Sequence, residues 1–392
     1  MRILLCNYEY PPLGGGGGVV MAALARELAR RHTITVLTSR ALGLPAESIE
    51  GDVRVLRVPV FFRRELAVAN VASMSAYLPM AGLRALTLQR SGNFDVINTH
   101  FVVPTGPLGH LLGRVWRVPN VLSVHGGDLY DPSKRISPHR LAWLRKPICY
   151  LLARADALVG QSRNTLQNVE EIYGVRRPTH LIPLGISRPP PVARVPRRDF
   201  GIPDDAFLMV TVGRLVARKA TVQLVQALAA AQRPAAHLLI VGDGPDAGAI
   251  QHAAAHAGLS DRVHLLGHVS EERKCQALSA ADVFISASQH EGFGLVFLEA
   301  MAFGLPIICY DHGGQTDFLA DGVTGHLVSL NDLDGLVRAL LNVHDRAPVR
   351  AAMSEHNRRL VEDYFIDKCA ARYETVFEEV ARDFAVAHRG GH

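Results

Sequence analysis

Residues 1–39 read MRILLCNYEYPPLGGGGGVVMAALARELARRHTITVLTS, in which two apolar, β-branched runs flank a segment of helical period. The runs lie at 1–7 and 32–39, and the helical segment lies at 19–31. This order of strand, helix and strand is typical of a parallel sheet with crossover helices. The stretch therefore predicts an α/β fold.

The same alternation continues along the chain and then starts again. Further strands are expected at 53–58, 94–99, 120–125, 157–162, 179–184, 207–213, 237–242, 263–267, 282–288 and 306–310. Residues 188–199, RPPPVARVPRRD, carry four prolines and four arginines without an apolar period, as a linker does. We predict two Rossmann-like domains, 1–187 and 200–365, that face each other across a cleft. A helix at about 366–386 is expected to pack back on the first domain.

The composition favours a folded enzyme in a reducing compartment. The chain is 48% hydrophobic and 20% charged and has 34 glycines, which suits buried parallel strands with short turns. Five scattered cysteines without a Cys-x-x-Cys pair indicate neither a disulfide framework nor a zinc site. The apolar stretch 65–83 is interrupted by polar residues and predicts a pair of soluble helices. We expect a cytoplasmic protein.

The net charge of +5 is unevenly distributed. Residues 1–187 hold 22 Lys and Arg against 12 Asp and Glu, whereas residues 188–392 hold 20 against 25. The basic first half suits an anionic acceptor or a membrane surface, and the absence of a nucleic-acid-binding motif argues against nucleic acid. Residues 138–155 combine Arg140, Arg145, Lys146 and Arg154 with apolar and aromatic side chains. Peripheral contact with an anionic membrane, at its inner face, and a helix packed on its own sheet both fit this pattern.

The stretch EGFGLVFLEAMAFGLP, residues 291–306, carries the strongest functional signal. A helix that begins after a glycine turn offers free N–H groups and a positive dipole end to phosphate oxygens. Glu299 lies about 7 Å along that helix, where a carboxylate can accept both hydroxyl groups of a ribose. Glu291, in the preceding loop, can meet a sugar hydroxyl. Taken alone, both glutamates could equally be ordinary surface charges.

Together with other segments, this stretch resembles glycosyltransferase family 4, whose Glu-x7-Glu motif matches Glu291 and Glu299. The resemblance covers nearly the whole chain. It includes SVHGGD at 123–128, HLIPLGIS at 180–187, GRLVARK at 213–219, VGDGP at 241–245 and LLGHVSEE at 265–272. It implies a GT-B fold, a nucleotide-sugar donor bound by the second domain, an acceptor on the side of the first domain, and retention of anomeric configuration.

The resemblance also implies roles for individual residues. The catalytic groups would be His125, Arg214, Lys219 and Glu291. The donor-binding groups would be Gly16, Gly17, Gly213, Gly267, His268, Val269, Phe293, Gly294, Leu295 and Glu299. Asp128 and His100 are weaker candidates for contact with the acceptor. The cations Arg214 and Lys219 would stabilise the departing diphosphate in place of a metal, so we expect no metal and no cofactor.

The sequence departs from the family pattern at two positions, and it is also compatible with other functions. Ala220 stands where the family favours glycine, and Asp317 stands where it favours glutamate. Asp332 and Asp334 form a metal-binding Asp-x-Asp pattern, but they open a predicted helix and favour a capping role. A nucleotide-sugar epimerase and a non-catalytic binding protein are the alternatives. A UDP-sugar is the first donor expected, and the acceptor could be a glycan, a lipid or a small molecule.

Overall fold

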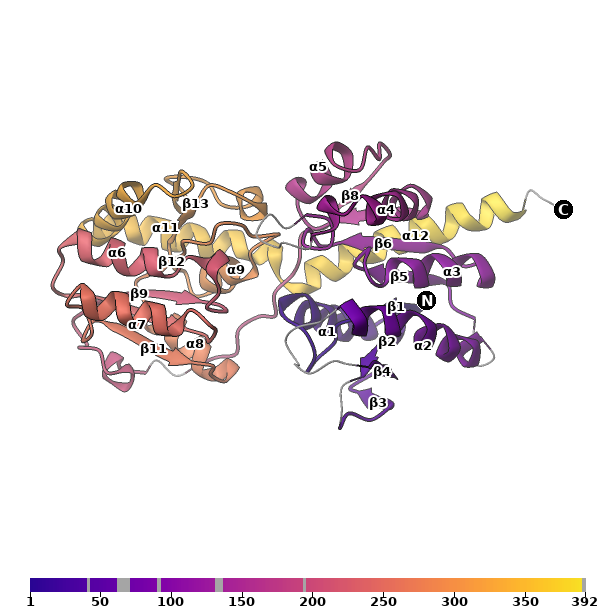
Figure 1. The fold of residues 1–392 in the computed structure, drawn as a ribbon, viewed down its shortest axis with the longest axis horizontal. Helices are drawn as coiled ribbons and strands as arrows, with labels where there is room; N and C mark the ends of the chain where they lie inside the picture. The colour runs from indigo at the N-terminus through magenta and orange to yellow at the C-terminus, as the bar shows by residue number, and fades with distance from the viewer. Residues whose placement is uncertain (41–42, 62–70, 90–92, 131–136, 193–194, 390–392) are drawn as a thin grey trace. The chain divides into compact units, whose positions relative to one another are not determined.

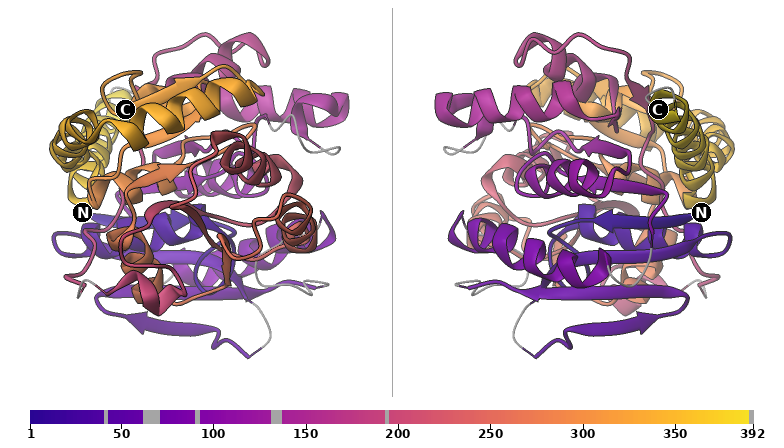
Figure 2. Two further views of the ribbon diagram at one scale, coloured as in Figure 1. Left: turned by 90° about the vertical axis from the view of Figure 1, so that its left-hand side faces the viewer. Right: turned by 90° about the vertical axis from the view of Figure 1, so that its right-hand side faces the viewer.

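The chain forms two compact units in a computed structural model (Figure 1). The structure describes residues 1–392 except 41–42, 62–70, 90–92, 131–136, 193–194 and 390–392. The first unit comprises Met1–Ser187 and Phe365–His392, and the second comprises Arg188–Tyr364. Each unit has its own sheet with helices on both faces (Figure 2).

The sheet of the first unit has the strand order β3-β4-β2-β1-β5-β6-β7-β8 and is parallel except at the edge strand β3. Its strands are β1 (Arg2–Cys6), β2 (Thr33–Arg40), β3 (Glu47–Glu50), β4 (Val53–Pro59), β5 (Val96–His100), β6 (Asn120–Val124), β7 (Ala157–Gly160) and β8 (His180–Leu181). Its helices are α1 (Gly16–Ala29), α2 (Val71–Gln89), α3 (Gly106–Trp116), α4 (Ala142–Arg154), α5 (Arg163–Glu171) and α12 (Ile366–Arg389).

The sheet of the second unit is parallel throughout, in the order β11-β10-β9-β12-β13-β14. Its strands are β9 (Phe207–Val212), β10 (Ala236–Val241), β11 (Val263–Gly267), β12 (Val283–Ile285), β13 (Ile307–Tyr310) and β14 (Gly325–Val328). Its helices are α6 (Val222–Ala231), α7 (Ala247–His256), α8 (Glu271–Ala280), α9 (Leu295–Ala302), α10 (Leu333–Asp345) and α11 (Ala347–Leu360).

Both faces of the first sheet are buried, which explains why its strands are apolar runs rather than alternating patterns. Successive side chains of β1 point to opposite faces, so Leu5 packs toward α1 and α12, and Leu4 packs toward α2 and α3. The helix α12, drawn in yellow in Figure 1, lies against α1 and adds Tyr373 and Phe377 to the core. The end of the chain is thus part of the first unit.

The strand orders place a topological switch point in each sheet, between β1 and β5 in the first unit and between β9 and β12 in the second. Consecutive crossovers leave such a point in opposite directions, so the loops at the carboxyl ends of the two strands diverge and leave room for a ligand. The glycine-rich loop before Gly16 follows β1, and the loop that contains Glu291 follows β12. The candidate residues therefore come from the loops in which ligands of such sheets bind.

The described structure differs from the sequence-based expectation in several elements. The edge strand β3, ESIE, was not predicted because its alternating, largely solvated side chains show no continuous apolar run. The helix α8 and the strand β14 were also not predicted, and β8 has two residues instead of six. The pair of helices expected at 65–83 is wrong for the described part, where one helix, α2, runs through Pro79.

Two further expectations concern membrane segments and capping. Within the described residues, no helix is long and apolar enough to cross a membrane. The capping role of Asp332 is confirmed, because its Oδ1 accepts a hydrogen bond of 2.8 Å from the N–H of Gly335 at the start of α10. All five cysteines are free thiols.

Candidate functional site

The loop after β9 packs tightly against the loop after β10. Gly213 and Gly242 approach each other so closely that a Cβ atom on Gly242 would lie 1.9 Å from the carbonyl oxygen of Gly213. A short 3-10 turn at Ala217–Lys219 then returns the chain toward β12. Ala220 follows with a φ of 45°, a left-handed conformation that glycine adopts more readily. This explains the family's preference for glycine there.

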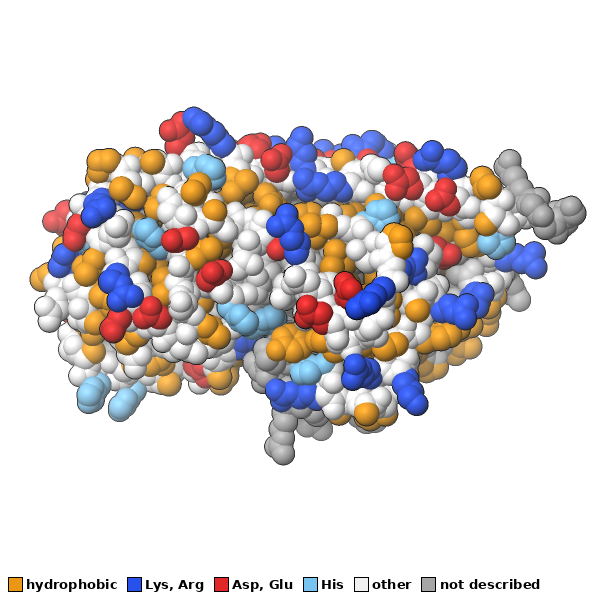
Figure 3. Space-filling model, turned by 90° about the horizontal axis from the view of Figure 1, so that it is seen from above, with side chains coloured by type: hydrophobic (Ala, Val, Ile, Leu, Met, Phe, Trp, Pro, Cys, Tyr) orange, Lys and Arg blue, Asp and Glu red, His pale blue; other side chains and the backbone are white. Residues whose placement is uncertain are grey.

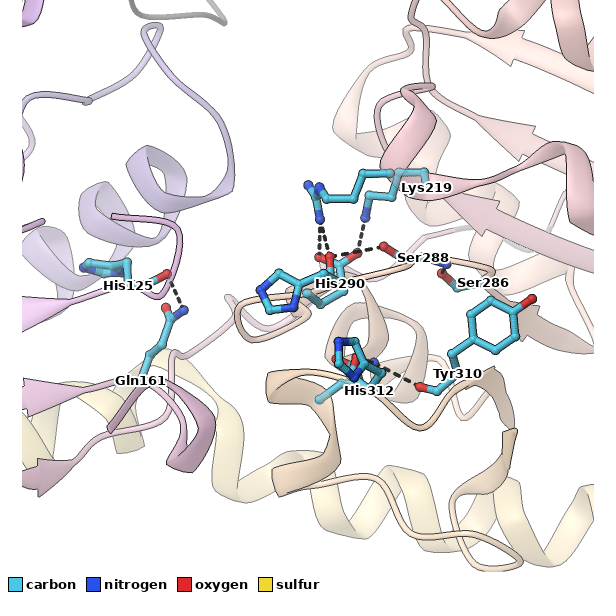
Figure 4. Close-up of polar contacts among 11 residues, drawn as sticks. His125, Gln161, Lys219, Ser286, Ser288, His290, Tyr310 and His312 are labelled. Carbon is cyan, nitrogen blue, oxygen red and sulfur yellow. Dashed lines mark hydrogen bonds and ion pairs between the residues drawn. The ribbon is translucent and has the colours of Figure 1, made fainter. Parts of the chain in front are cut away.

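The turn brings Lys219 to Glu291, from the loop after β12. The Nζ atom of Lys219 donates a hydrogen bond to Oε1 of Glu291, and Nη1 of Arg218 lies 3.5 Å from Oε2 (Figure 4). Arg218 also donates to the carbonyl oxygen of His290. Burial would raise the pKa of Glu291, but the charges of Lys219 and Arg218 outweigh it and hold the pKa below its ordinary value. Glu291 is therefore an ionised, buried anion between two cations.

The two arginines of the GRLVARK segment, Arg214 and Arg218, differ in their surroundings. Arg214 is exposed, and among the described residues its guanidinium group has no hydrogen-bond or ion-pair partner. Arg218 instead contacts protein groups. The sequence did not single out Arg218, although it lies inside the GRLVARK segment. The structure thus leaves Arg214 available to a ligand and assigns Arg218 to the support of Glu291.

The helix α9 begins at a glycine turn, as predicted. Gly294, the residue before the helix, has a φ of 96°. The preceding loop lies so close to residues 313–315 that a Cβ atom on Gly314 would meet the carbonyl oxygen of Gly292 at 2.1 Å. The fully buried Gln315 fixes this second loop by donating to the carbonyl oxygens of Tyr310 (3.1 Å) and His312 (2.8 Å), a contact drawn in Figure 4. The start of α9 is therefore held rigidly.

The side chain of Phe293 points into the core rather than toward a ligand. It is 3% exposed and packs against Phe318, with the ring centroids 5.3 Å apart. Only backbone groups of Phe293 can therefore contact a donor. Together with Gly294 and Leu295 it places the N–H groups of the first turn of α9, which have no partner within the helix, at the strand end.

Glu299 has a partner that the sequence did not indicate. Its Oε2 lies 3.1 Å from Nζ of Lys274 on α8, and Lys274 also binds Glu271 at 2.8 Å. Burial raises the pKa of Glu299, and the Lys274 charge opposes this rise. Lys274 therefore fixes the orientation of the carboxylate that is the candidate partner of a ribose.

The predicted donor-binding residues Gly267, His268 and Val269 lie at the carboxyl end of β11, at the same edge of the sheet. Gly267 has a φ of 69°, and its carbonyl oxygen accepts a hydrogen bond of 2.9 Å from the N–H of Gly242. The side chain of His268 is exposed, and Val269 is half-buried. The structure places these residues beyond β10, two strands from the loop of Gly213.

In the first unit, His125 directly follows β6. Its carbonyl oxygen accepts a hydrogen bond of 2.7 Å from Nε2 of Gln161, as Figure 4 shows. Its ring stacks on Phe101 with the centroids 4.3 Å apart, and Nε2 lies 2.9 Å from Nδ1 of His100. Burial lowers the pKa of His125 to about 4, against a smaller opposing effect of Gln161. Both the ring and the carbonyl group are thus fixed in place, and the imidazole is neutral.

The predicted acceptor contacts of Asp128 and His100 are not favoured by their surroundings. The carboxylate of Asp128 is buried and accepts hydrogen bonds from the N–H groups of Val102 (2.7 Å) and His125 (2.9 Å). His100 is 2% exposed and is enclosed between His125 and Asn98. The carboxylate of Asp128 thus binds the turn after β6, and the ring of His100 contacts His125 and Asn98. Contact of either residue with an acceptor stays a prediction.

The glycine-rich loop is more ordered than its sequence predicts. Five consecutive glycines at 14–18 would suggest bare backbone amides, but this is wrong for two of them. The N–H of Gly15 donates to Glu9 (3.4 Å), and the N–H of Gly18 donates to the carbonyl oxygen of Gly15 (3.0 Å). The helix α1 already begins at Gly16. A Cβ atom on Gly17 would lie 2.8 Å from the ring of Phe101. Gly16 and Gly17 thus form a helix amino terminus beside the residue that stacks on His125.

Within the part of the chain that the structure describes, no group of three or more His, Cys, Asp or Glu side chains is placed to hold a metal ion. Four cationic side chains, Arg214, Arg218, Lys219 and Lys274, lie in or beside these loops of the second unit.

Comparisons with known proteins agree with this arrangement. Residues 14–188 match the family model described as Glycosyltransferase Family 4, and residues 194–360 match that described as Glycosyl transferases group 1. The chain is 28% identical to N-acetyl-alpha-D-glucosaminyl L-malate synthase of Bacillus anthracis, over 95% of this chain and 96% of that protein. It is 29% identical to D-inositol 3-phosphate glycosyltransferase of Xylanimonas cellulosilytica, over 95% and 94%.

The fold has close counterparts among solved structures. Sucrose-phosphate synthase from Thermosynechococcus elongatus is similar with a TM-score of 0.83 and 22% identity, over 97% of this chain and 99% of that one. These matches disfavour an epimerase and a non-catalytic binding protein. The chain belongs to the family 4 glycosyltransferases, and it is a glycosyltransferase enzyme of the GT-B type.

Proposed function

We propose that this enzyme transfers a sugar from a nucleoside diphosphate sugar to a small anionic acceptor, with retention of the anomeric configuration. The observation that carries the proposal is the meeting of Lys219, Arg218 and Glu291 just before the amino terminus of α9. Cations and free N–H groups at one strand end suit a diphosphate.

The departure of the nucleoside diphosphate is the step that these groups would assist. Breaking the bond between the sugar and the diphosphate leaves negative charge on the β-phosphate, and cations fixed beside it stabilise the transition state more than the ground state. Lys219 is held in place by Glu291, and the exposed Arg214 can close on the phosphates. With these two cations in place, the reaction needs no metal and no other cofactor.

The donor would be held at two further points. Glu299, oriented by Lys274, would accept the ribose hydroxyl groups, and the backbone after β11 would contact the base. The expected base is uracil, which backbone groups near Gly267, His268 and Val269 would recognise.

Retention of configuration is proposed from the resemblance to family 4, and the state of Glu291 bears on the route by which it would occur. Its carboxylate is bound by two cations, so it is a poor nucleophile and is committed to holding Lys219. We therefore favour substitution on one face of the sugar without a covalent enzyme intermediate. The fixed carbonyl group of His125 would stabilise positive charge that develops at the anomeric carbon.

The acceptor class is inferred from charge and from the relatives. One relative is named for L-malate and another for D-inositol 3-phosphate, which are both small, hydroxylated anions. The first 187 residues of this chain have 22 Lys and Arg against 12 Asp and Glu, which favours an anionic acceptor over a neutral glycan or lipid.

The test is a matrix of UDP-, GDP- and ADP-sugars against L-malate, D-inositol 3-phosphate and the neutral analogue inositol, with nucleotide release as the measurement. We expect release that depends on one donor base and on an anionic acceptor. Equal release with inositol would contradict the anionic acceptor class, and release without any acceptor would contradict transfer.

We also propose that α3 and α4 make peripheral contact with an anionic membrane, with the enzyme on the cytoplasmic side. Four exposed hydrophobic side chains support this: Leu111, Val115, Trp143 (68% exposed) and Tyr150. Figure 3 shows this side of the molecule, where basic and acidic side chains stand among hydrophobic ones. Such a surface binds anionic lipids through the burial of its hydrophobic side chains and through the attraction of its cations to the lipid headgroups. Each cation contributes about 1 kcal/mol.

Sedimentation with vesicles tests the membrane contact. Binding should rise with the fraction of anionic lipid and fall with salt, and Trp143→Ser should weaken it without changing sugar transfer to a soluble acceptor. Binding that is independent of anionic lipid, or unchanged in Trp143→Ser, would contradict this contact.

A further inference from the structure

A row of polar side chains lies under α12, at the carboxyl ends of β5 and β6. These strands pair with His100 opposite Ser123, and the alternation of side chains puts Asn98, His100 and Ser123 on one face. The same face carries Val96 and Val121, which pack in the core with α12. The polar side chains of the row therefore lie next to the hydrophobic core on this face. Because they are buried, each of them needs a hydrogen-bond partner.

The amide group of Asn98 has a forced orientation. Its Nδ2 donates to the carbonyl oxygen of Val121 (3.1 Å) and to Oγ of Ser123 (3.0 Å). A carbonyl oxygen can only accept, so the nitrogen of this amide must face Val121. The hydroxyl group of Tyr373, on α12, donates to the same Oγ of Ser123 at 3.0 Å and steadies it from above. The Oδ1 atom of Asn98 is thereby turned toward His100.

This orientation fixes the proton of His100. The Oδ1 of Asn98 lies 2.5 Å from Nε2 of His100 and can only accept, so Nε2 must carry a proton. His100 is 2% exposed, and burial together with His125 lowers its pKa well below the ordinary value. The neutral ring has one proton, so its Nδ1 is a bare acceptor.

The proton of His125 follows from that of His100. The Nε2 of His125 lies 2.9 Å from the bare Nδ1 of His100, and a hydrogen bond between them requires the proton to be on His125. The imidazole of His125 is also neutral, with a pKa of about 4. Its Nδ1 is therefore unprotonated, and this atom is buried without a hydrogen-bond partner among the described residues.

We propose that Asn98 is a positioning residue which, through His100, holds His125 in the tautomer protonated at Nε2, so that Nδ1 accepts a hydrogen bond from a substrate hydroxyl. The inference deepens the proposed function, on which its substrate end rests. It also gives α12 a part in the site, because Tyr373 supports Ser123 and thus the amide of Asn98.

The tautomer can be measured directly by two-bond ¹H–¹⁵N correlation spectra of the full chain labelled with ¹⁵N-histidine. The chain has 18 histidines, and loss of signals in His125→Gln identifies those of His125. We expect a protonated Nε2 and a bare Nδ1 in the wild-type enzyme. In Asn98→Leu, His100 loses its acceptor and both tautomers of His125 should appear.

A matched pair at His100 guards against loss of folding in Asn98→Leu. His100→Leu removes the acceptor for His125 and should give the mixed pattern. His100→Asn can place an amide oxygen near the position of Nδ1 and should restore the wild-type pattern. In both leucine variants kcat should fall about tenfold, as expected for one neutral hydrogen bond, with the affinity for nucleoside diphosphate unchanged.

A wild-type His125 protonated at Nδ1 would overturn the inference, as would an unchanged pattern in both leucine variants. The spectra require no substrate. Failure of sugar transfer would therefore count only against the proposed function. A His125 ring protonated at Nδ1 would count only against the positioning role of Asn98 and His100.

Discussion

The ammonium group of Lys219 and the carboxylate of Glu291 form an ion pair whose side chains are only 15% and 11% exposed. Removing one partner of such a pair leaves an uncompensated charge in a poorly hydrated place, at a loss of about 3 to 5 kcal/mol. The ion pair therefore contributes both to the free energy of unfolding of the second unit and to the position of the proposed catalytic group Lys219.

Lys219→Met should accordingly lower both the free energy of unfolding and kcat, the latter by about 100-fold. The double variant Lys219→Met/Glu291→Gln removes both charges and should recover most of the stability but none of the activity. Denaturant unfolding and steady-state rates on the same samples separate the two effects. Recovery of activity in the double variant would show that Lys219 has no role beyond its pair with Glu291.

Arg214 should behave differently, because it is exposed and unpaired among the described residues. Arg214→Ala should leave the free energy of unfolding unchanged and lower kcat by about 100-fold, and Arg214→Lys should lose less because it keeps the charge. EDTA should not change the rate of the wild-type enzyme. A loss of activity in EDTA that magnesium restores would contradict the replacement of a metal by these cations.

The contact between Lys274 and Glu299 predicts an effect on nucleotide binding. Lys274→Met should weaken the binding of nucleoside diphosphate by about tenfold or more, because the carboxylate loses its charged partner and its orientation. Calorimetry measures this affinity. Glu271→Gln is the matched control, since it removes the exposed partner of Lys274 and leaves the contact with Glu299 intact. Equal losses in the two variants would argue against the role of Glu299 in binding ribose.

The buried histidine pair predicts a specific dependence of stability on pH. An unfolded chain protonates histidine near a pKa of about 6.5, whereas burial lowers the pKa of His125 to about 4 in the folded enzyme. The unfolded state therefore binds more protons between these values. The contribution of His125 is complete above about pH 6.5 and is lost as the pH falls toward 4. In His125→Gln the free energy of unfolding should fall less steeply over this window, and the exposed His256→Gln should match the wild type.

The sequence predicted which loops form the site but not how the residues pair. The positions of Gly213, Glu291 and His125 at strand ends follow from local apolar patterns, which depend on near neighbours. The roles of Arg218, Lys274 and Gln161 depend on contacts between segments far apart in the chain, such as Gln161 with the carbonyl oxygen of His125, 36 residues earlier. No local pattern distinguishes such a side chain from an ordinary polar one.

The surroundings of Asp128 and the order of the glycine-rich loop could not be predicted for the same reason. A carboxylate just after a strand end suggests a group that can bind a ligand. In the structure, the carboxylate of Asp128 accepts hydrogen bonds from two backbone N–H groups. Five glycines resemble a flexible loop, yet Glu9 and the start of α1 order part of it. The edge strand β3 escaped prediction because its partly solvated residues lack the apolar run that marks the inner strands.

The most direct test of the central claim is the anomeric configuration of the product, followed by ¹H NMR during a reaction of the purified enzyme with its nucleoside diphosphate sugar and acceptor. With an α-linked donor, we expect the first product formed to be α-linked, and kcat to fall about 100-fold in Arg214→Ala. A β-linked first product would contradict the retaining mechanism.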